Sequence, residues 1–193
     1  MATFSVHVLP NPPENEATFR EYSNRLRSLR LKSLQSDPDK WISRYDSEIQ
    51  EPPEFWWNRL RAEGVIHHVL VANAGNDKSS VQYLLEGQWI GFVVTTCPAP
   101  DMQPEYHIAA VYIDQNFRGR GLAKILMREV QNTVKAEASK AAQPSPYCTI
   151  GSLHGNEVAA RLYQSMGFQV TNPDEIVERA GFTYHTTAMR MDL

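Results

Sequence analysis

The sequence predicts a single α/β domain built around a mixed β-sheet, and three observations support this prediction. The chain has 193 residues, a length typical of one domain, and 42% of them are hydrophobic. Short apolar runs with strand character alternate with longer segments whose apolar residues recur at helical spacing. Their order is strand, helices, several strands, helix, strand, helix and strand, which differs from a regular βαβ series. We therefore expect one domain over residues 1–193, of the α/β (or α+β) class.

The helices are predicted from apolar residues that recur every three or four positions. The predicted helical segments are 17–34, a zone from 41 to 62, 121–142 and 156–168. The apolar stripes of the first and third segments are Phe19, Tyr22, Leu26 and Leu29, and Leu122, Leu126, Val130 and Val134. In the last segment we expect Val158, Leu162 and Met166 to form the apolar stripe, and Gly167 to end the helix.

The strands are predicted from short runs rich in β-branched and aromatic residues. These runs are 4–9, 67–74, 88–97, 105–113, 147–153 and 182–193. The polar run 73–80 predicts a turn between two of them. The middle strands follow one another closely, so we expect an antiparallel meander in the first half of the sheet.

Charge, cysteine content and hydropathy exclude several classes of protein. The formal net charge of −3 argues against a nucleic-acid binder held by bulk positive charge. Two cysteines, Cys97 and Cys148, are too few for a disulfide framework or a zinc site. The histidines outside the candidate site show no metal-binding spacing: His7, His67, His68 and His185. The first residues lack a secretory pattern and no run approaches about 18 apolar residues, so we expect a cytoplasmic protein without a membrane segment.

The turn from Arg118 to Ala123 is the first candidate binding site. It follows an apolar strand and opens a strongly helical run, and it contains Gly119 and Gly121. The first amide groups of a helix have no intrahelical partner and carry a partial positive charge, so small residues there allow a phosphate to approach. The P-loop pattern is absent, and Lys124 stands where a dinucleotide fingerprint needs its third glycine. The alternative is a glycine-containing turn that binds no ligand.

Two patterns in this half of the chain resemble the signatures of the GNAT N-acetyltransferase family. The first is Arg118-x-x-Gly121-x-Ala123, and the second is Asn156-x-x-Ala159-x-x-x-Tyr163, followed by Gly167-Phe168. Segment 26–41 is also similar to the opening of small-molecule members, so the resemblance covers most of the chain. It implies a mostly antiparallel sheet of about seven strands with flanking helices, splayed between the fourth and fifth strands. Ser152 departs from the family, which often has an apolar residue there.

The resemblance implies acetyl-CoA as cosubstrate and no metal. The residues that it places on the pyrophosphate, besides Arg118 of the signature, are Gly119, Arg120, Gly121, Leu122 and Ala123, through their main-chain amides. It places Val111, Tyr112 and Ile113 along the pantetheine, as if the cofactor were another strand. Asn156 would hydrogen-bond the cofactor or order the last helix, on which Ala159 and Tyr163 lie.

Acetyl transfer to an amine needs a base, an oxyanion donor and an acid, because an alkyl ammonium is not a nucleophile. The resemblance assigns the donor to the Val111 amide and the acid to Tyr163, for which simple packing is the alternative. His107 is the first candidate for the base, since imidazole titrates near neutrality. Glu105 is the second candidate, His154 is a third, and a water relay is also open. A bulge in the strand would change the face on which His107 lies.

The expected acceptor is the primary amine of a small molecule, either an amine or an amino acid. A protein or peptide acceptor, or a non-catalytic acyl-CoA-binding module, is the alternative. Three tryptophans, Trp41, Trp56 and Trp57, form an aromatic wall for the acceptor or seal the core. The basic residues of the first helix, which attract a carboxylate or face solvent, are Arg20, Arg25, Arg27, Arg30 and Lys32. We expect direct transfer without an acetyl-cysteine, no nucleic-acid or membrane partner, and a monomer or homodimer.

Overall fold

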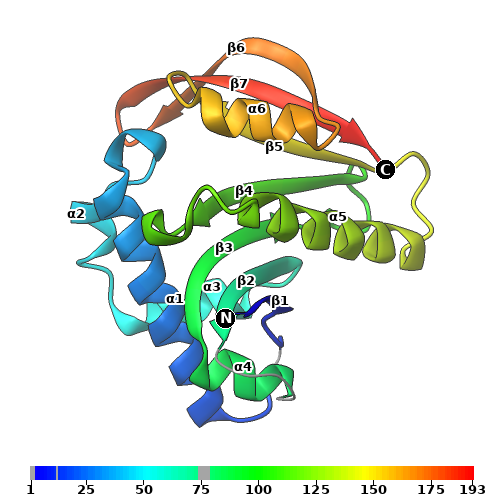
Figure 1. Cartoon of the computed structure of the whole chain (residues 1–193). Coiled ribbons are helices and arrows are strands. Elements are labelled where there is room, and N and C mark those ends of the chain that lie inside the picture. Colours follow the sequence, from blue (N-terminus) through cyan, green and yellow to red (C-terminus); the bar gives the residue numbers. More distant parts are fainter. Residues whose placement is uncertain (1–2, 12, 74–78) are drawn as a thin grey trace.

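A seven-stranded sheet forms the centre of the computed structural model, which describes residues 3–11, 13–73 and 79–193 (Figure 1). The strands are β1 (Thr3–Val8), β2 (Val65–Asn73), β3 (Gln88–Thr96), β4 (Glu105–Ile113), β5 (Tyr147–Leu153), β6 (Gln169–Arg179) and β7 (Phe182–Asp192). Their order across the sheet is β1-β2-β3-β4-β5-β7-β6, and every neighbouring pair is antiparallel except the parallel pair β4–β5. The predicted fold class and the meander are therefore confirmed.

Helices cover both faces of this sheet, and two apolar clusters fill the spaces between them. The helices are α1 (Glu16–Ser36), η1 (Pro38–Lys40), α2 (Tyr45–Glu48), α3 (Pro53–Arg61), α4 (Ser80–Glu86), η2 (Gln115–Phe117), α5 (Leu122–Lys140) and α6 (Glu157–Ser165). Alternate residues of β2 divide between the faces: Val69 and Val71 pack with α1 and α3, whereas Leu70 packs with α5. Among the described residues, no helix is long and apolar enough to cross a membrane.

The strongly periodic helices agree with the sequence prediction, whereas α6 differs from it. All four predicted stripe residues of α1 and all four of α5 are buried. In α6 the predicted stripe is confirmed in part: Leu162 and Met166 pack against the core cluster, but Val158 is 73% exposed and the fully buried side chain is Tyr163. Tyr163 packs with Phe168 just beyond the helix, so the long aromatic side chain decides which face is buried. Gly167 follows the helix at φ +98°, as expected for the residue that ends it.

Strand β6 and helix α4 were not predicted from the sequence, and neither were the three-residue helices η1 and η2. Strand β6 is an edge strand whose residues are mostly exposed, so it lacks the apolar alternation that predicts a half-buried strand. Helix α4 has seven residues and depends on a capping box between Ser79 and Gln82. Residues 74–78 of the predicted turn at 73–80 lie outside the described residues, and α4 begins at its last position.

Strand β4 contains the irregularity that shapes the site. Its register with β3 shifts between Phe92 and Val94, so that two residues of β4 oppose one of β3. Ala110 lies in this bulge with φ +58°, a left-handed conformation that is uncommon outside glycine. Along its other edge, residues 105–108 of β4 pair with residues 147–150 of β5. Among the described residues, this pairing does not continue past Ile108 and Ile150. The two halves of the sheet therefore separate just after Ile108.

Candidate active site

The glycine turn between β4 and α5 presents a row of free amide groups. Gly119 and Gly121 have φ +76° and +73°, and a Cβ atom built on either one meets no atom within 4 Å. Glycine is therefore needed there for backbone conformation and not for space. The amides of residues 119–123 donate no hydrogen bond to any residue that the structure describes. With the N-terminus of the 19-residue helix α5 behind them, these amides can hold the phosphates of a nucleotide cofactor.

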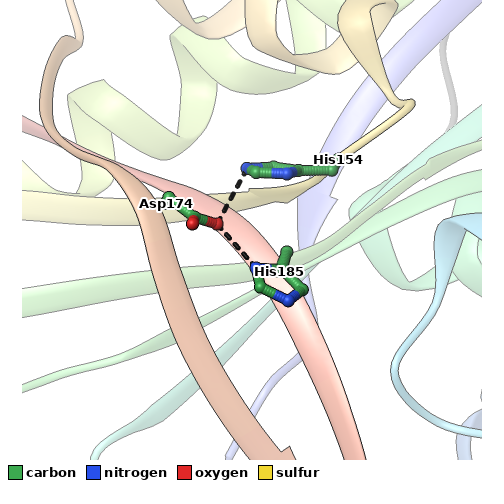
Figure 2. A group of neighbouring side chains, drawn as sticks. All are labelled: His154, Asp174 and His185. Atoms are coloured by element: carbon green, nitrogen blue, oxygen red, sulfur yellow. Dashed lines mark hydrogen bonds and ion pairs between the residues drawn. The ribbon is translucent and has the colours of Figure 1, made fainter.

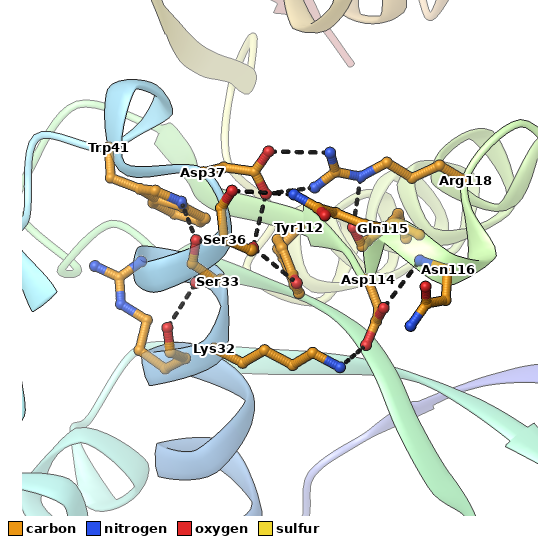
Figure 3. Close-up of polar contacts among 12 residues, drawn as sticks. Lys32, Ser33, Ser36, Asp37, Trp41, Tyr112, Asp114, Gln115, Asn116 and Arg118 are labelled. Carbon is orange, nitrogen blue, oxygen red and sulfur yellow. Dashed lines mark hydrogen bonds and ion pairs between the residues drawn. The ribbon is translucent and has the colours of Figure 1, made fainter.

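The side chain of Arg118 secures this turn to the rest of the domain (Figure 3). Its Nε donates to the carbonyl of Ile113 (2.8 Å), and its two Nη atoms donate to the carboxylate of Asp37 (3.0 and 2.6 Å). These hydrogen bonds hold the pKa of Asp37 below its ordinary value. Arg118 therefore joins the turn to the end of α1, and its own amide donates to the carbonyl of Gln115 (3.3 Å), so its role at the turn is to hold it in place.

The free edge of β4 is where the structure places the predicted pantetheine residues. Val111, Tyr112 and Ile113 follow the bulge and lie beyond the last β4–β5 pair. Tyr112 points to the α1 face, where its hydroxyl is 3.3 Å from that of Ser36 (Figure 3). Val111 and Ile113 belong to the cluster on the opposite face. The bulge thus changes the alternation of the strand and leaves main-chain groups of Val111 at the opening between the two halves of the sheet.

Tyr163 lies on α6 in the cluster that includes Val111. It is 5% exposed, it packs edge-to-face on Phe168, and its hydroxyl forms no hydrogen bond with a described residue. Burial raises the pKa of Tyr163 well above its ordinary value, so the hydroxyl stays protonated and remains a donor. The side chain is therefore suited to donate a hydrogen bond to a thiolate as it leaves.

The start of the same helix holds the rest of the second signature. Asn156 is the N-cap residue of α6, but its side chain caps no amide and is bonded to none of the described residues. Its carbonyl accepts a hydrogen bond from the hydroxyl of Ser152 (3.2 Å), which explains how a buried polar residue is tolerated in β5. Ala159 packs against the same cluster as Tyr163. The Asn156 amide is thus available to a ligand.

The candidate bases lie on the face of β4 opposite to the one that packs with α5 and Tyr163. Glu105 and His107 flank the buried Tyr106 and point away from α5, and each pairs in register with a polar residue of β5, Tyr147 and Thr149. The Thr149 hydroxyl donates to Oε1 of Glu105 (2.6 Å), and its oxygen is 3.0 Å from Nδ1 of His107. A hydroxyl has one proton, so Thr149 accepts from Nδ1–H of His107. In the neutral imidazole this arrangement places the proton on Nδ1 and leaves the lone pair of Nε2 free to accept one.

His154, the third candidate base, belongs to a different group of side chains. It follows β5 and its Nε2 lies 3.0 Å from the carbonyl of Pro173. Figure 2 shows it beside Asp174 and His185, which lie on β6 and β7. Neither His107 nor Thr149 takes part in this group, so the structure separates His154 from the chain that links the first two candidates.

The predicted aromatic wall is not a single surface. Trp56 is 1% exposed and seals the core beside α1. Trp57 is covered by the guanidinium of Arg20, 5.0 Å from its ring. Trp41 stacks parallel to Phe92 with centroids 6.3 Å apart, and it is the tryptophan nearest to Tyr112 on the α1 face. Trp41 and Trp57 both pack against the cluster on the α1 face, and Trp41 is the one that contacts Phe92 and Tyr112.

The basic residues of α1 all have hydrogen-bond partners. Arg30 pairs with Glu48 through two bonds (3.0 and 2.7 Å) and is buried. The remaining contacts are Arg20 with Glu16, Arg25 with Glu21 and two carbonyls, Arg27 with the carbonyl of Ile49, and Lys32 with Asp114. A carboxylate acceptor would have to compete with these bonds, so the basic helix is mainly structural.

Neither cysteine is suited to carry an acetyl group. Cys148 is fully buried, and burial raises its pKa to about 12. Cys97 is half-buried, and burial also raises its pKa. Both thiols are therefore protonated near neutrality, and a protonated thiol is a poor nucleophile. This is the environment expected for structural cysteines.

Solved structures with the same fold include several acetyltransferases. NAA60 from Arabidopsis thaliana, in complex with acetyl-CoA, is 18% identical and aligns over 99% of each chain with a TM-score of 0.63. Spermidine N-acetyltransferase from Vibrio cholerae, in complex with CoA and spermine, is 13% identical, with 98% of this chain and 95% of that chain covered and a TM-score of 0.62. At these identities the likeness shows the fold alone. No curated protein sequence matches the chain.

A family model decides the assignment. The model described as "Acetyltransferase (GNAT) domain" matches residues 66–170, which is more than half of the chain. The matched range begins in β2 and contains the bulge of β4, the free amides of the glycine turn and Tyr163. The protein therefore belongs to the GNAT family and is an acetyl-CoA-dependent N-acetyltransferase.

Proposed function

We propose that the protein transfers the acetyl group of acetyl-CoA directly to the primary amine of a small molecule, with His107 as the base. The observation that carries this proposal is the chain of hydrogen bonds from Glu105 through Thr149 to Nδ1 of His107. A carboxylate that fixes the tautomer of a histidine and balances the charge of the imidazolium is a general way to make that histidine a base. Here the carboxylate acts through a hydroxyl.

The proposed step uses groups on both faces of the open sheet. The ammonium of the acceptor gives a proton to Nε2 of His107, and the free amine attacks the thioester carbonyl. The amide of Val111 donates to the oxygen that becomes an oxyanion. The bond from carbon to sulfur then breaks, and the second proton of the attacking nitrogen passes to the thiolate of CoA, to which the hydroxyl of Tyr163 donates a hydrogen bond. Its raised pKa means that Tyr163 acts chiefly as a hydrogen-bond donor.

Two side-chain contacts favour a small acceptor over a long peptide. Nζ of Lys40 donates to the carbonyl of Gly155 (2.5 Å), which links η1 to the loop that precedes α6. The guanidinium of Arg44 lies over the ring of Phe182, 5.3 Å from its centroid, which links the segment before α2 to β7. Lys40 and Arg44 follow α1, which packs on the first half of the sheet, whereas Gly155 and Phe182 belong to the second half, so both contacts join the two halves. An extended chain in this region would have to displace them.

The activity is tested by measuring thiol release from acetyl-CoA over a panel of acceptors. The panel contains small amines, amino acids and short peptides with a free N-terminus. We expect release with a class of small amines and none with the peptides. Release with the peptides alone would contradict the proposed acceptor class.

The role of Tyr163 is tested by Tyr163→Phe, which removes only a hydroxyl that no described residue binds. General acid catalysis contributes about 10²–10⁴-fold, so we expect turnover to fall by about 10²-fold. Acetyl-CoA binding, measured by titration calorimetry, should be retained. Unchanged turnover would show that Tyr163 only packs, and lost binding would show a structural role.

A further inference from the structure

A group of three side chains outside the two signatures has the chemistry of a metal site. His154 lies in the loop between β5 and α6, Asp174 lies on β6 and His185 lies on β7 (Figure 2). One nitrogen from each histidine and one carboxylate oxygen all lie within 4.8 Å of one another. The sequence spacing did not indicate this site, because the three residues come from three different elements.

The backbone holds the three residues in place. The amide of His154 donates to the carbonyl of His185 (2.9 Å), which fixes the loop against β7. The register between β6 and β7 shifts from Asn172 to Glu175, and Asp174 lies in this irregular stretch. Its amide donates to the side chain of Asn172 (3.2 Å), a local turn that directs the carboxylate toward the histidines. The convergence thus follows from bonds that the main-chain amides of His154 and Asp174 make, and not from the side chains of the three residues themselves.

Both histidines approach the same carboxylate oxygen. Nδ1 of His185 donates to Oδ1 of Asp174 (2.7 Å), and Nε2 of His154 lies 3.8 Å from that oxygen. The three side chains are 45–59% exposed, so in water these contacts contribute little to stability. Nδ1 of His154 and Nε2 of His185 have no partner among the described residues. Nε2 of His154 also donates to the carbonyl of Pro173 (3.0 Å), and this bond must break before that nitrogen can bind an ion. Each ring can then carry its proton on the outer nitrogen and offer the inner one to the ion.

We propose that His154, Asp174 and His185 bind a zinc-class divalent metal ion that fastens the loop before α6 to the β6–β7 hairpin. Two imidazoles and one carboxylate are a donor set for zinc-like ions, whereas magnesium and calcium prefer oxygen ligands alone. Zinc lies about 2.0–2.2 Å from such ligands, so the donor atoms must come to about 3–4 Å from one another. The present separations of 2.7 and 3.8 Å are close to this range. A water molecule would complete the tetrahedron.

The test is a calorimetric titration of the purified chain with zinc, after removal of any polyhistidine tag and of adventitious metal. We expect one ion per chain. Asp174→Asn keeps an oxygen that accepts from His185 but removes the charge, so it separates a metal site from a hydrogen-bonded cluster. Asp174→Asn, His154→Gln and His185→Gln should each weaken zinc binding at least tenfold. The matched control is His7→Gln on β1, at the opposite edge of the sheet, and it should bind as the wild type does.

A second measurement follows thermal unfolding with and without zinc. An ion that binds the folded chain alone raises the melting temperature, so zinc should raise it for the wild type and His7→Gln but not for Asp174→Asn. Because all three side chains are exposed, the variants should fold, which acetyl-CoA binding can verify. Absence of saturable zinc binding by the wild type, or wild-type binding by the cluster variants, would overturn the proposal. Equal loss in His7→Gln would overturn it as well.

Discussion

Replacing Gly121 by alanine should destabilise the protein through backbone conformation alone. Gly121 has φ +73° and is the N-cap residue of α5, and a Cβ atom there would meet nothing within 4 Å. No clash therefore adds to the effect. The left-handed conformation costs an alanine about 1–2 kcal/mol. The smaller freedom of alanine in the unfolded chain offsets about 0.4–1 kcal/mol of this cost.

The net loss of unfolding free energy in Gly121→Ala is then about 1 kcal/mol. For a chain of this size, each kcal/mol lowers the melting temperature by about 2–4 °C. Gly151→Ala is the matched control, because Gly151 also has open space around a built Cβ but no left-handed φ. That variant should gain about 0.4–1 kcal/mol. The difference between the two variants isolates the conformational cost, about 1–2 kcal/mol.

The measurement is urea unfolding of both variants beside the wild type, together with calorimetric titration of acetyl-CoA. Gly121→Ala should also weaken acetyl-CoA binding, because the strained residue relaxes and turns the free amides of residues 119–123 away from the pyrophosphate. Equal stability changes in Gly121→Ala and Gly151→Ala would refute the argument that conformation requires this glycine. Unchanged cofactor affinity in a destabilised Gly121→Ala would refute its link to the phosphate site.

Three further predictions concern the base, the buried ion pair and the thiols. Thr149→Val should lower kcat/KM, because the link from Glu105 to His107 is cut, whereas Thr149→Ser should restore it; equal kcat/KM for all three proteins would contradict the relay. Glu48→Gln should lower the unfolding free energy by about 3 kcal/mol, because it leaves Arg30 buried without its partner charge. Burial alone would raise the pKa of Glu48, but the bonds and charges of Arg30 and Arg59 outweigh burial and lower the pKa below 4.5. The stabilisation by Glu48 is therefore complete above pH 4.5 and is lost as the pH falls through the lowered pKa. In urea unfolding, the free energy of unfolding should therefore depend less on pH for Glu48→Gln than for the wild type on the acid side. Cys148→Ala should keep turnover within a few-fold in the thiol-release assay, and complete loss in a folded variant would contradict direct transfer.

Local sequence determined much of this protein. Apolar spacing located α1 and α5, whose predicted stripes are all buried, because long amphipathic helices encode the face that they bury. The two signatures located the glycine turn and α6, since a strand, a left-handed glycine and a helix N-terminus follow one another along the chain. Strand β6 could not be predicted from the apolar pattern, because an exposed edge strand has no apolar alternation.

Tertiary structure decided how the candidate residues work together. The bulge at Ala110 changes the face of β4, and nothing in the residue types of the strand specifies where it occurs. Thr149 joins Glu105 to His107 only because β5 lies parallel to β4 in one register. His154 and His185 are 31 positions apart in the sequence and meet because β5 and β7 are neighbours in the sheet. Pairing across strands depends on register and order, which residue spacing along one segment does not record.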